Sequence, residues 1–313
     1  MTTATMTNNG LKTETLTFRP GRLEDLYAIY CIFEETLADL IKRFGSSATT
    51  SWHDPVAMEK IWQERRPLFE HLARTAAQFW IAEYNGEPVG YARSIFRDGL
   101  CELTDFFVKP DAQSLGAGRG LMERTFPVEG TTRKNIIATT DMRAQRLYMR
   151  YGVVPRFLIY YFGREPEVTS VETDLVFERV TVEPETLDRL AAIDHAIIEH
   201  RRDDDHAWLL DQREGYLYYR DGRPVGYGYL GANNGPFALL DPADYPAVLA
   251  HAESEAARQG REFGLEVPTI NLTAVEYLIA RGFRLDSFAA VFMSDKPYGK
   301  FENYIITSPP FFF

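Results

Sequence analysis

A glycine-rich loop between a short strand and a helix is the part of this 313-residue sequence best suited to chemistry. An apolar strand over 103–108 stops at Pro110, and a loop then leads through Gly116, Gly118 and Gly120 into a helix. Backbone N–H groups at a helix N-terminus lack intrahelical partners, and glycine lets an anion approach them closely. The loop therefore predicts a site for a phosphorylated ligand.

The spacing of the glycines decides between kinds of phosphate loop. Neither the dinucleotide fingerprint G-x-G-x-x-G nor the P-loop G-x-x-x-x-G-K-[ST] fits this run. Residues 113–118 read Q-S-L-G-A-G, which fits [Q/R]-x-x-G-x-[G/A], and they follow a hydrophobic-x-Val-x-Pro strand end at 106–110. Downstream, 141–153 reads D-M-R-A-Q-R-L-Y-M-R-Y-G-V, which predicts an amphipathic helix that Gly152 ends.

These two segments, in this order, resemble the pyrophosphate loop and the second motif, N-x-x-A-x-x-L-Y-x-x-x-G-F, of the GNAT superfamily of acyl-CoA-dependent N-acetyltransferases. The resemblance implies acetyl-CoA as co-substrate and direct attack of a primary amine on its thioester, without a metal. Asp141 replaces the commoner Asn and is expected to repel a phosphorylated ligand. The implied cofactor-binding residues are Phe106, Phe107, Val108, Gln113, Ser114, Leu115, Gly116, Ala117, Gly118, Arg119 and Asp141.

The implied reaction needs a proton acceptor for the amine, a donor for the developing oxyanion and an acid near the leaving thiolate. Glu102 lies six residues before Val108, where some family members carry a general-base glutamate, and in a regular strand it shares a face with 104, 106 and 108. Asp105 is the competing carboxylate, which a β-bulge could re-aim. The resemblance makes Tyr148 the acid, and the amide of Val108 is our candidate oxyanion donor. The structural alternatives are a surface or Arg-paired glutamate, a packed aspartate and a core tyrosine.

Hydrophobic periodicity and turn signals predict the elements that position these residues. In chain order they are a strand at 16–20, a helix from 26, a helix at 58–77, strands at 78–84, 88–96 and 103–108, a helix after the glycine loop, a strand at 135–139, the helix from 141 and a strand at 156–162. This is the order that the resemblance implies, an α/β fold with a mixed sheet flanked by helices. The acceptor pocket is expected around Trp52 and His53.

The second half of the sequence repeats the first at a distance of about 130 to 136 residues. N-G-E-P-V-G-Y at 85–91 returns as D-G-R-P-V-G-Y at 221–227, and the helix motif returns at 271–283. A period of this length is a whole domain. We therefore expect a flexible tail over 1–14, a GNAT-type domain over 15–165 and a second GNAT-like copy over 166–313.

The second copy lacks the features that would hold the cofactor. After its strand at 236–240 the chain runs D-P-A-D-Y-P-A-V, which has no G-x-G, two prolines that remove amide donors, and carboxylates that repel phosphate. Leu278 stands where the first copy has Tyr148. We expect this degenerate copy not to bind acyl-CoA in the family's manner, and instead to shape the acceptor pocket or a homodimer.

Composition and charge exclude several classes of function. Residues 1–165 carry a net charge of +1 and 166–313 a net charge of −12, so no half is basic and nucleic-acid binding is disfavoured. The acidic half could attract a cationic acceptor, or simply keep the protein in solution. With only two cysteines, no signal-peptide pattern at the start and no apolar run near ~20 residues, we expect no membrane association and a cytoplasmic location.

Three further features have plainer explanations than function. His195 and His200 are five residues apart and so lie on different helical faces, which favours a charged helix end over a metal site. Cys101 has no neighbouring base, which favours a buried thiol over a nucleophile. The segment Phe311 to Phe313 is too short for a membrane anchor and is expected to pack against the second copy.

Two rival functions remain open at the level of sequence. One is an acyl-CoA-binding regulatory protein without turnover, and the other is a tandem enzyme of the kind that makes mycothiol, in which the second copy is the working one. The acceptor also stays open between a small amine, an aminoglycoside, an amino acid and a protein N-terminus.

Overall fold

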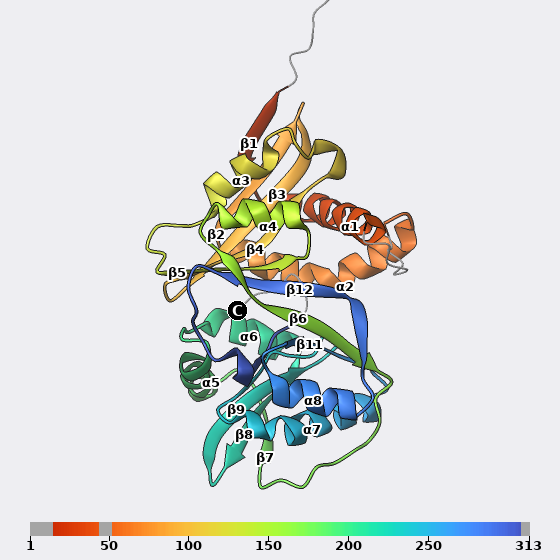
Figure 1. Ribbon diagram of the computed structural model, residues 1–313, viewed down its shortest axis with the longest axis vertical. Coiled ribbons are helices and arrows are strands. Elements are labelled where there is room, and N and C mark those ends of the chain that lie inside the picture. The colour runs from red at the N-terminus through yellow and green to blue at the C-terminus, as the bar shows by residue number, and fades with distance from the viewer. Residues whose placement is uncertain (1–14, 44–51, 308–313) are drawn as a thin grey trace, which may run out of the picture.

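The computed structural model describes residues 15–43 and 52–307. The predicted tail over 1–14 and the segment Phe311 to Phe313 therefore lie outside the described residues. Figure 1 shows two halves, the first above and the second below, joined through a layer in which β12, β6 and β11 lie side by side. No helix in the described ranges has the length and apolar character to cross a membrane.

The first half follows the predicted order of elements, and the α/β prediction is confirmed. The second helix begins three residues earlier than predicted because the Asp54 carboxylate caps it, accepting the amides of Val56 and Ala57, with Pro55 at its first position. In chain order the elements are β1 (Leu16–Pro20), α1 (Leu26–Arg43), α2 (Pro55–Arg74), β2 (Ala76–Tyr84), β3 (Glu87–Arg97), β4 (Leu100–Val108), α3 (Ala117–Thr125), β5 (Arg133–Thr139), α4 (Met142–Met149) and β6 (Val154–Arg164).

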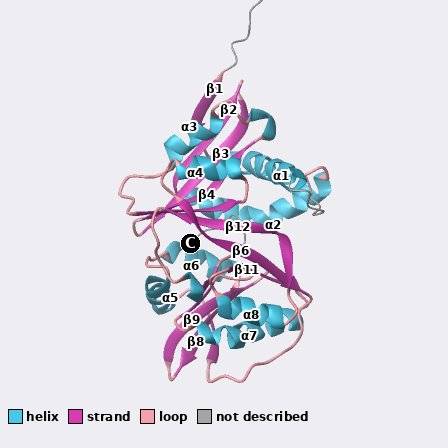
Figure 2. Ribbon diagram, in the orientation of Figure 1, coloured by secondary structure: helices cyan, strands magenta, loops and turns pink. Residues whose placement is uncertain are grey.

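The second half repeats that order and then adds one short strand. Its elements are β7 (Val176–Val180), α5 (Pro184–Ile197), α6 (Asp203–Gln212), β8 (Glu214–Arg220), β9 (Arg223–Leu230), β10 (Phe237–Leu239), α7 (Tyr245–Arg258), β11 (Phe263–Pro268), α8 (Leu272–Ala280), β12 (Arg284–Ser294) and β13 (Tyr304–Ile305). Figure 2 shows the same arrangement of helices and strands in both halves. The sequence repeat therefore corresponds to a repeated fold.

The two halves exchange strands in the larger of the two sheets. Its order is β1-β2-β3-β4-β5-β12-β6-β11, so β12 of the second half lies between β5 and β6 of the first, and β6 pairs with β11. The remaining strands form a sheet of order β13-β10-β9-β8-β7. The sequence indicates two copies in tandem but not this exchange. The second half thus completes the sheet of the first, and β6 of the first half supplies the partner of β11.

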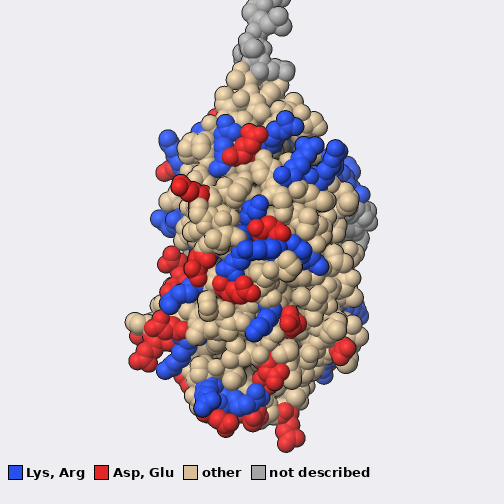
Figure 3. Space-filling view, turned by 60° about the vertical axis from the view of Figure 1, so that its left-hand side comes forward, with Lys and Arg blue, Asp and Glu red and all other residues tan. Residues whose placement is uncertain are grey.

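Helices cover both faces of the first-half part of this sheet. On one face α1 and α2 pack through Phe33 and Phe69, and on the other α3 and α4 pack through Leu121 and Tyr148. Two side chains of β12, those of Val291 and Met293, belong to the core under α3 and α4. On the face seen in Figure 3, acidic and basic side chains are interspersed over both halves.

Candidate functional site

Strands β4 and β5 separate and open a cleft between them. Their parallel pairing runs only from Leu100–Arg133 to Leu103–Ile136, while β4 itself continues to Val108. Its other edge stays bound to β3, where the Lys109 N–H donates to the Val89 carbonyl at 2.8 Å. N–H groups alternate between the two edges of an antiparallel strand, so the amide of Val108 points away from β3, toward the cleft. This is the direction that the predicted oxyanion contact requires.

A β-bulge at Thr104 changes which side chains of β4 share a face. The pairing with β3 steps from Arg93–Asp105 to Ser94–Leu103, which leaves Thr104 as an extra residue. Leu103 and Phe106 therefore both lie in the core under α3 and α4. The expectation that Glu102 shares a face with 104, 106 and 108 is wrong, because the extra residue reverses the alternation.

A cavity of about 400 Å³ occupies the cleft and reaches elements on both faces of the sheet. Among the sequence-predicted residues it brings together Phe106, Phe107, Val108, Gln113, Ser114, Gly118, Asp141 and Tyr148. Of the others, Leu115 and Gly116 lie in the loop and Ala117 and Arg119 in the first turn of α3, and none of the four lines the described cavity. Glu102, Trp52 and His53 do not line it either. The second half contributes Phe288 and Ala290 of β12 to its wall.

The glycine loop has a backbone shape that suits close approach of an anion. Gly116 precedes α3 with a φ of 95°, and Ser114 has a φ of 84°, both in the left-handed region. The side-chain amide of Gln113 donates to the Val108 carbonyl at 3.2 Å and ties the loop to β4. The first amides of α3 have no acceptors within the helix, so this turn can hold a diphosphate.

Two arginines pair with Asp141. Its carboxylate is therefore not a lone negative charge beside a bound phosphate. It caps α4 by accepting the Arg143 N–H at 2.8 Å, and it forms ion pairs with Arg43 at 2.9 Å and Arg143 at 3.2 Å. Burial raises the pKa of Asp141, but these bonds outweigh burial and lower it to about 2. Because both arginines line the cavity, they offset the repulsion expected from the sequence.

Tyr148 occupies a place where it can serve both the core and the reaction. Its side chain is 5% exposed, lines the cavity and packs edge-on against Phe106, with ring centroids 5.7 Å apart. Burial raises the pKa of the Tyr148 hydroxyl well above its usual range, and the charge of Asp141 raises it further. The hydroxyl therefore stays protonated at neutral pH, the form that a proton donor must have.

The two candidate carboxylates are both buried and neither lines the cavity. Asp105 binds Arg93 at 2.9 Å and accepts from the Tyr91 hydroxyl at 3.2 Å, which fits the packed alternative. Glu102 is 1% exposed and pairs in register with Asn135. Burial, and next the charge of Glu102, raise the pKa of Tyr298 from the second half. Glu102 thus lies inside the protein near Tyr298, where the two halves meet. Its role as the base stays a prediction.

His206 of the second half belongs to a buried polar network. His206 lies 2.7 Å from both the Asp194 carboxylate and the Tyr229 hydroxyl, and it is fully buried. His200 is also buried, whereas His195 is exposed. The charged helix end predicted for His195 and His200 therefore fits His195, in the last turn of α5, and is wrong for His200. Within the described ranges, no group of three potential metal ligands comes together.

Cys101 is a free, buried thiol in the core under α3 and α4. Burial raises the pKa of Cys101, which disfavours the thiolate that a nucleophile requires. Its position fits the structural explanation given from the sequence.

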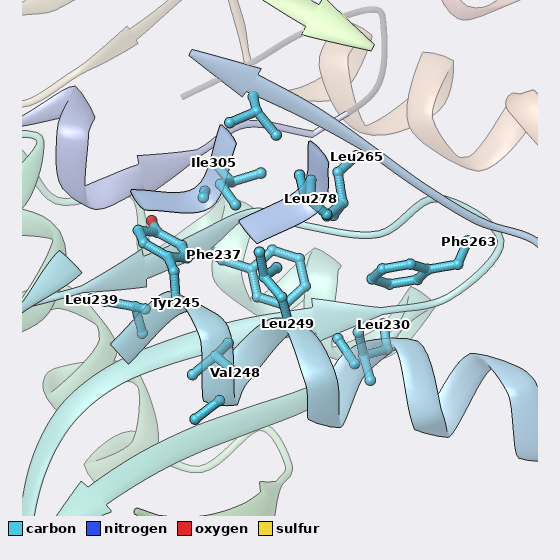
Figure 4. Close-up of a cluster of buried hydrophobic side chains, with 14 of the residues drawn as sticks. Leu230, Phe237, Leu239, Tyr245, Val248, Leu249, Phe263, Leu265, Leu278 and Ile305 are labelled. Carbon is cyan, nitrogen blue, oxygen red and sulfur yellow. The ribbon is translucent and has the colours of Figure 1, made fainter. Parts of the chain in front are cut away.

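In the second half, the place that corresponds to the cleft is filled by the chain itself. β10 pairs with β13 through Phe237–Ile305 and Ala238–Tyr304, and Ile306 bridges from there to Glu266 of β11. Ile305 is buried in an apolar cluster with Phe237, Leu265 and Leu278 (Figure 4). Asn271, the counterpart of Asp141, donates to the Tyr304 carbonyl at 3.4 Å. Strand β13 therefore covers the β10 edge that matches the open edge of β4.

Residues that sequence reasoning missed come from elements distant in the chain. Arg43 reaches Asp141 across 98 residues, Arg65 lies on α2, and Tyr161 and Phe288 lie on the exchanged strands. The amphipathic pattern of α1 and α2 showed that these helices pack on the sheet, but it carries no signal for which polar residue reaches the cleft.

Comparison with known proteins agrees with this geometry. Residues 75–155 match the model of the acetyltransferase (GNAT) domain. No curated protein matches the sequence. A proposed acetyltransferase from Pyrococcus horikoshii is similar in structure, with a TM-score of 0.68 and 16% identity over 96% of each chain.

Two further solved structures share the fold. A GCN5-related N-acetyltransferase from Sphaerobacter thermophilus has a TM-score of 0.57 and 17% identity, over 91% of this chain and 97% of that one. A tandem GNAT protein from the clavulanic acid biosynthesis pathway has a TM-score of 0.56 and 13% identity, over 90% of this chain and 99% of that one. Residues 75–155 are therefore similar to a GNAT acetyltransferase domain, and the chain as a whole shares the fold of these structures, including the tandem GNAT protein.

Proposed function

We propose that the protein is an N-acetyltransferase that transfers an acetyl group from acetyl-CoA to a primary amine in its first half. One observation carries the proposal: the edge of β4, the glycine loop and Tyr148 meet in a single cavity that continues to the opposite face of the sheet. A thioester carrier entering along the loop thus has a route to an acceptor bound under α1 and α2. No metal is required for this reaction.

Each part of the cavity has a role in this proposal. The amides of 114–118 bind the diphosphate, with Arg43 and Arg143 as cationic neighbours, and the amide of Val108 donates to the oxyanion. The amine nitrogen forms a bond to the thioester carbon, the C–S bond breaks, and Tyr148 gives its proton to the departing sulfur. The amine loses one proton to a base or to solvent, and Tyr148 regains one from solvent.

The second half is proposed to be a degenerate copy that begins near residue 166. Support comes from the missing glycine loop and from β13, which covers the edge of β10. This arrangement disfavours a tandem enzyme whose second copy is the working one. A cytoplasmic location, suggested by the two free cysteines, and a homodimer stay predictions.

Tyr148→Phe is expected to lower kcat by about 100-fold or more while leaving the Kd of acetyl-CoA within about threefold. Removing a positioned general acid costs a factor of this size, and the phenylalanine ring preserves the packing against Phe106. Release of CoA thiol with a panel of amines gives the rate, and calorimetry gives the affinity. An unchanged rate excludes the acid role. Tight acetyl-CoA binding by the native protein with no thiol release for any amine would favour the non-catalytic regulator.

Glu102→Gln tests the proposed base separately from the acid. If Glu102 accepts the amine's proton through an intervening group, the substitution lowers kcat/KM by about 100-fold. It also changes the pH dependence of kcat/KM. Asp105→Asn, which breaks the ion pair with Arg93, serves as the comparison for a purely structural loss. A fall in melting temperature for Glu102→Gln with no change in the pH profile would leave Glu102 a structural residue.

A further inference from the structure

The side chains that line the cavity on the side of α1 and α2 determine which acceptor can bind there. This side is built mainly from apolar and aromatic side chains: Phe33, Leu37, Leu40, Phe107, Tyr161 and Phe288. Phe33 and Phe107 meet edge to face with centroids 5.0 Å apart, and Tyr161 meets Phe288 in the same way at 5.6 Å. Four rings from four elements, α1, β4, β6 and β12, thus frame an apolar space.

The charged groups around this space are arginines. Arg65 of α2 lines the cavity with its guanidinium carbon 5.3 Å from the centre of the Phe33 ring, and its side chain is 31% exposed. The Glu34 carboxylate lies 4.0 Å from the Arg65 Nε, but Glu34 is not part of the described lining. Asp141 supplies the carboxylate in the described lining, and it already forms ion pairs with Arg43 and Arg143.

This distribution of charge disfavours a polycationic acceptor. An aminoglycoside or a polyamine carries ammonium groups beyond the one that reacts, and each needs a carboxylate or water when it is enclosed. The described part of the wall offers the guanidinium of Arg65 to such an ammonium group, not a carboxylate. A planar guanidinium with five N–H donors is instead suited to bind a carboxylate in bidentate fashion.

We propose that the acceptor is a small primary amine with an apolar or aromatic body and a carboxylate, and that Arg65 binds that carboxylate while the rings of α1, β4, β6 and β12 hold the body. This inference rests on the proposed function, since it names the substrate class of the same site.

The test compares single amines with the full-length protein at saturating acetyl-CoA, by release of CoA thiol. L-Phenylalanine has both the ring and the carboxylate, phenethylamine lacks the carboxylate, glycine lacks the ring, and spermidine is a polycation. L-Phenylalanine is expected to have the highest kcat/KM of the four. Arg65→Gln should lower that value by at least about tenfold through KM, and change the value for phenethylamine by less than about twofold.

Arg66→Gln is the matched control, because Arg66 lies next in α2, pairs with Glu70 at 2.7 Å and is outside the described lining. It should leave both amines unchanged. The inference is overturned if spermidine is the best of the four, if no apolar amino acid accepts the acetyl group, or if Arg65→Gln lowers both amines equally. Acetyl-CoA titration of the same samples separates the outcomes: with the cofactor bound and spermidine acetylated, the proposed function stands and only the acceptor class falls.

Discussion

Gly116→Val is expected to raise the Kd of acetyl-CoA by about 100-fold or more. Gly116 adopts a φ of 95°, which a β-branched residue does not tolerate, so the turn must change shape. Two or more hydrogen bonds from amides to a charged diphosphate are then lost, each contributing about 1.5–3 kcal/mol. Calorimetric titration with acetyl-CoA measures the effect directly.

The matched control is Gly86→Val in the hairpin between β2 and β3. Gly86 has a φ of 87°, and an added Cβ meets no atom within 4 Å, so the substitution imposes a similar backbone strain at a place without ligand. Both variants should lose thermal stability, and only Gly116→Val should lose the cofactor. Equal affinities in the two variants would show that the loop does not hold the diphosphate.

A chain that ends at residue 165 is expected to lose both its cooperative fold and acetyl-CoA binding. Without the second half, β5 loses its partner β12, and β6 loses both of its neighbours. The core under α3 and α4 loses Val291 and Met293, and the cavity loses Phe288 and Ala290. The exposed strand edges also favour aggregation. Circular dichroism, size exclusion and cofactor titration of the fragment test this expectation.

Co-expression of 1–165 with 166–313 sharpens that test. If the exchanged strands hold the halves together, the two fragments should purify as a complex that binds acetyl-CoA, and the complex should melt in one transition. A fragment 1–165 that folds alone and binds acetyl-CoA as tightly as the intact chain would contradict the dependence of the site on β12.

The local parts of the structure were predictable because local patterns determine them. The element order, the hairpin at Asn85–Gly86 and the left-handed conformation of Gly152 after α4 follow from hydrophobic periodicity and from the backbone preferences of glycine. That the glycine loop and the helix of Tyr148 belong to one site was predicted from two motifs in a fixed order. Their meeting in one cavity agrees with that prediction.

The parts that sequence reasoning missed depend on contacts between distant segments. The alternation of side chains expected for a regular strand gives no sign of the extra residue at Thr104. Because of that residue, the side chains of Glu102 and Phe106 lie on opposite faces of the sheet. The pairing of Arg43 with Asp141 joins α1 to α4. Likewise, the repeat predicted two complete copies, because the sequence of β12 does not show that it pairs with β5 of the first half rather than with β11 of its own.

The position of bound CoA is the most direct test of the whole account, and a crystal structure of the native chain with CoA measures it. We expect the diphosphate against the amides of 114–118, the pantetheine arm along the open edge of β4, and the sulfur near the Tyr148 hydroxyl. Strand β13 should remain paired with β10, with no CoA in the second half. CoA seated between β10 and β11, or a glycine loop closed over by side chains with CoA elsewhere, would contradict the account.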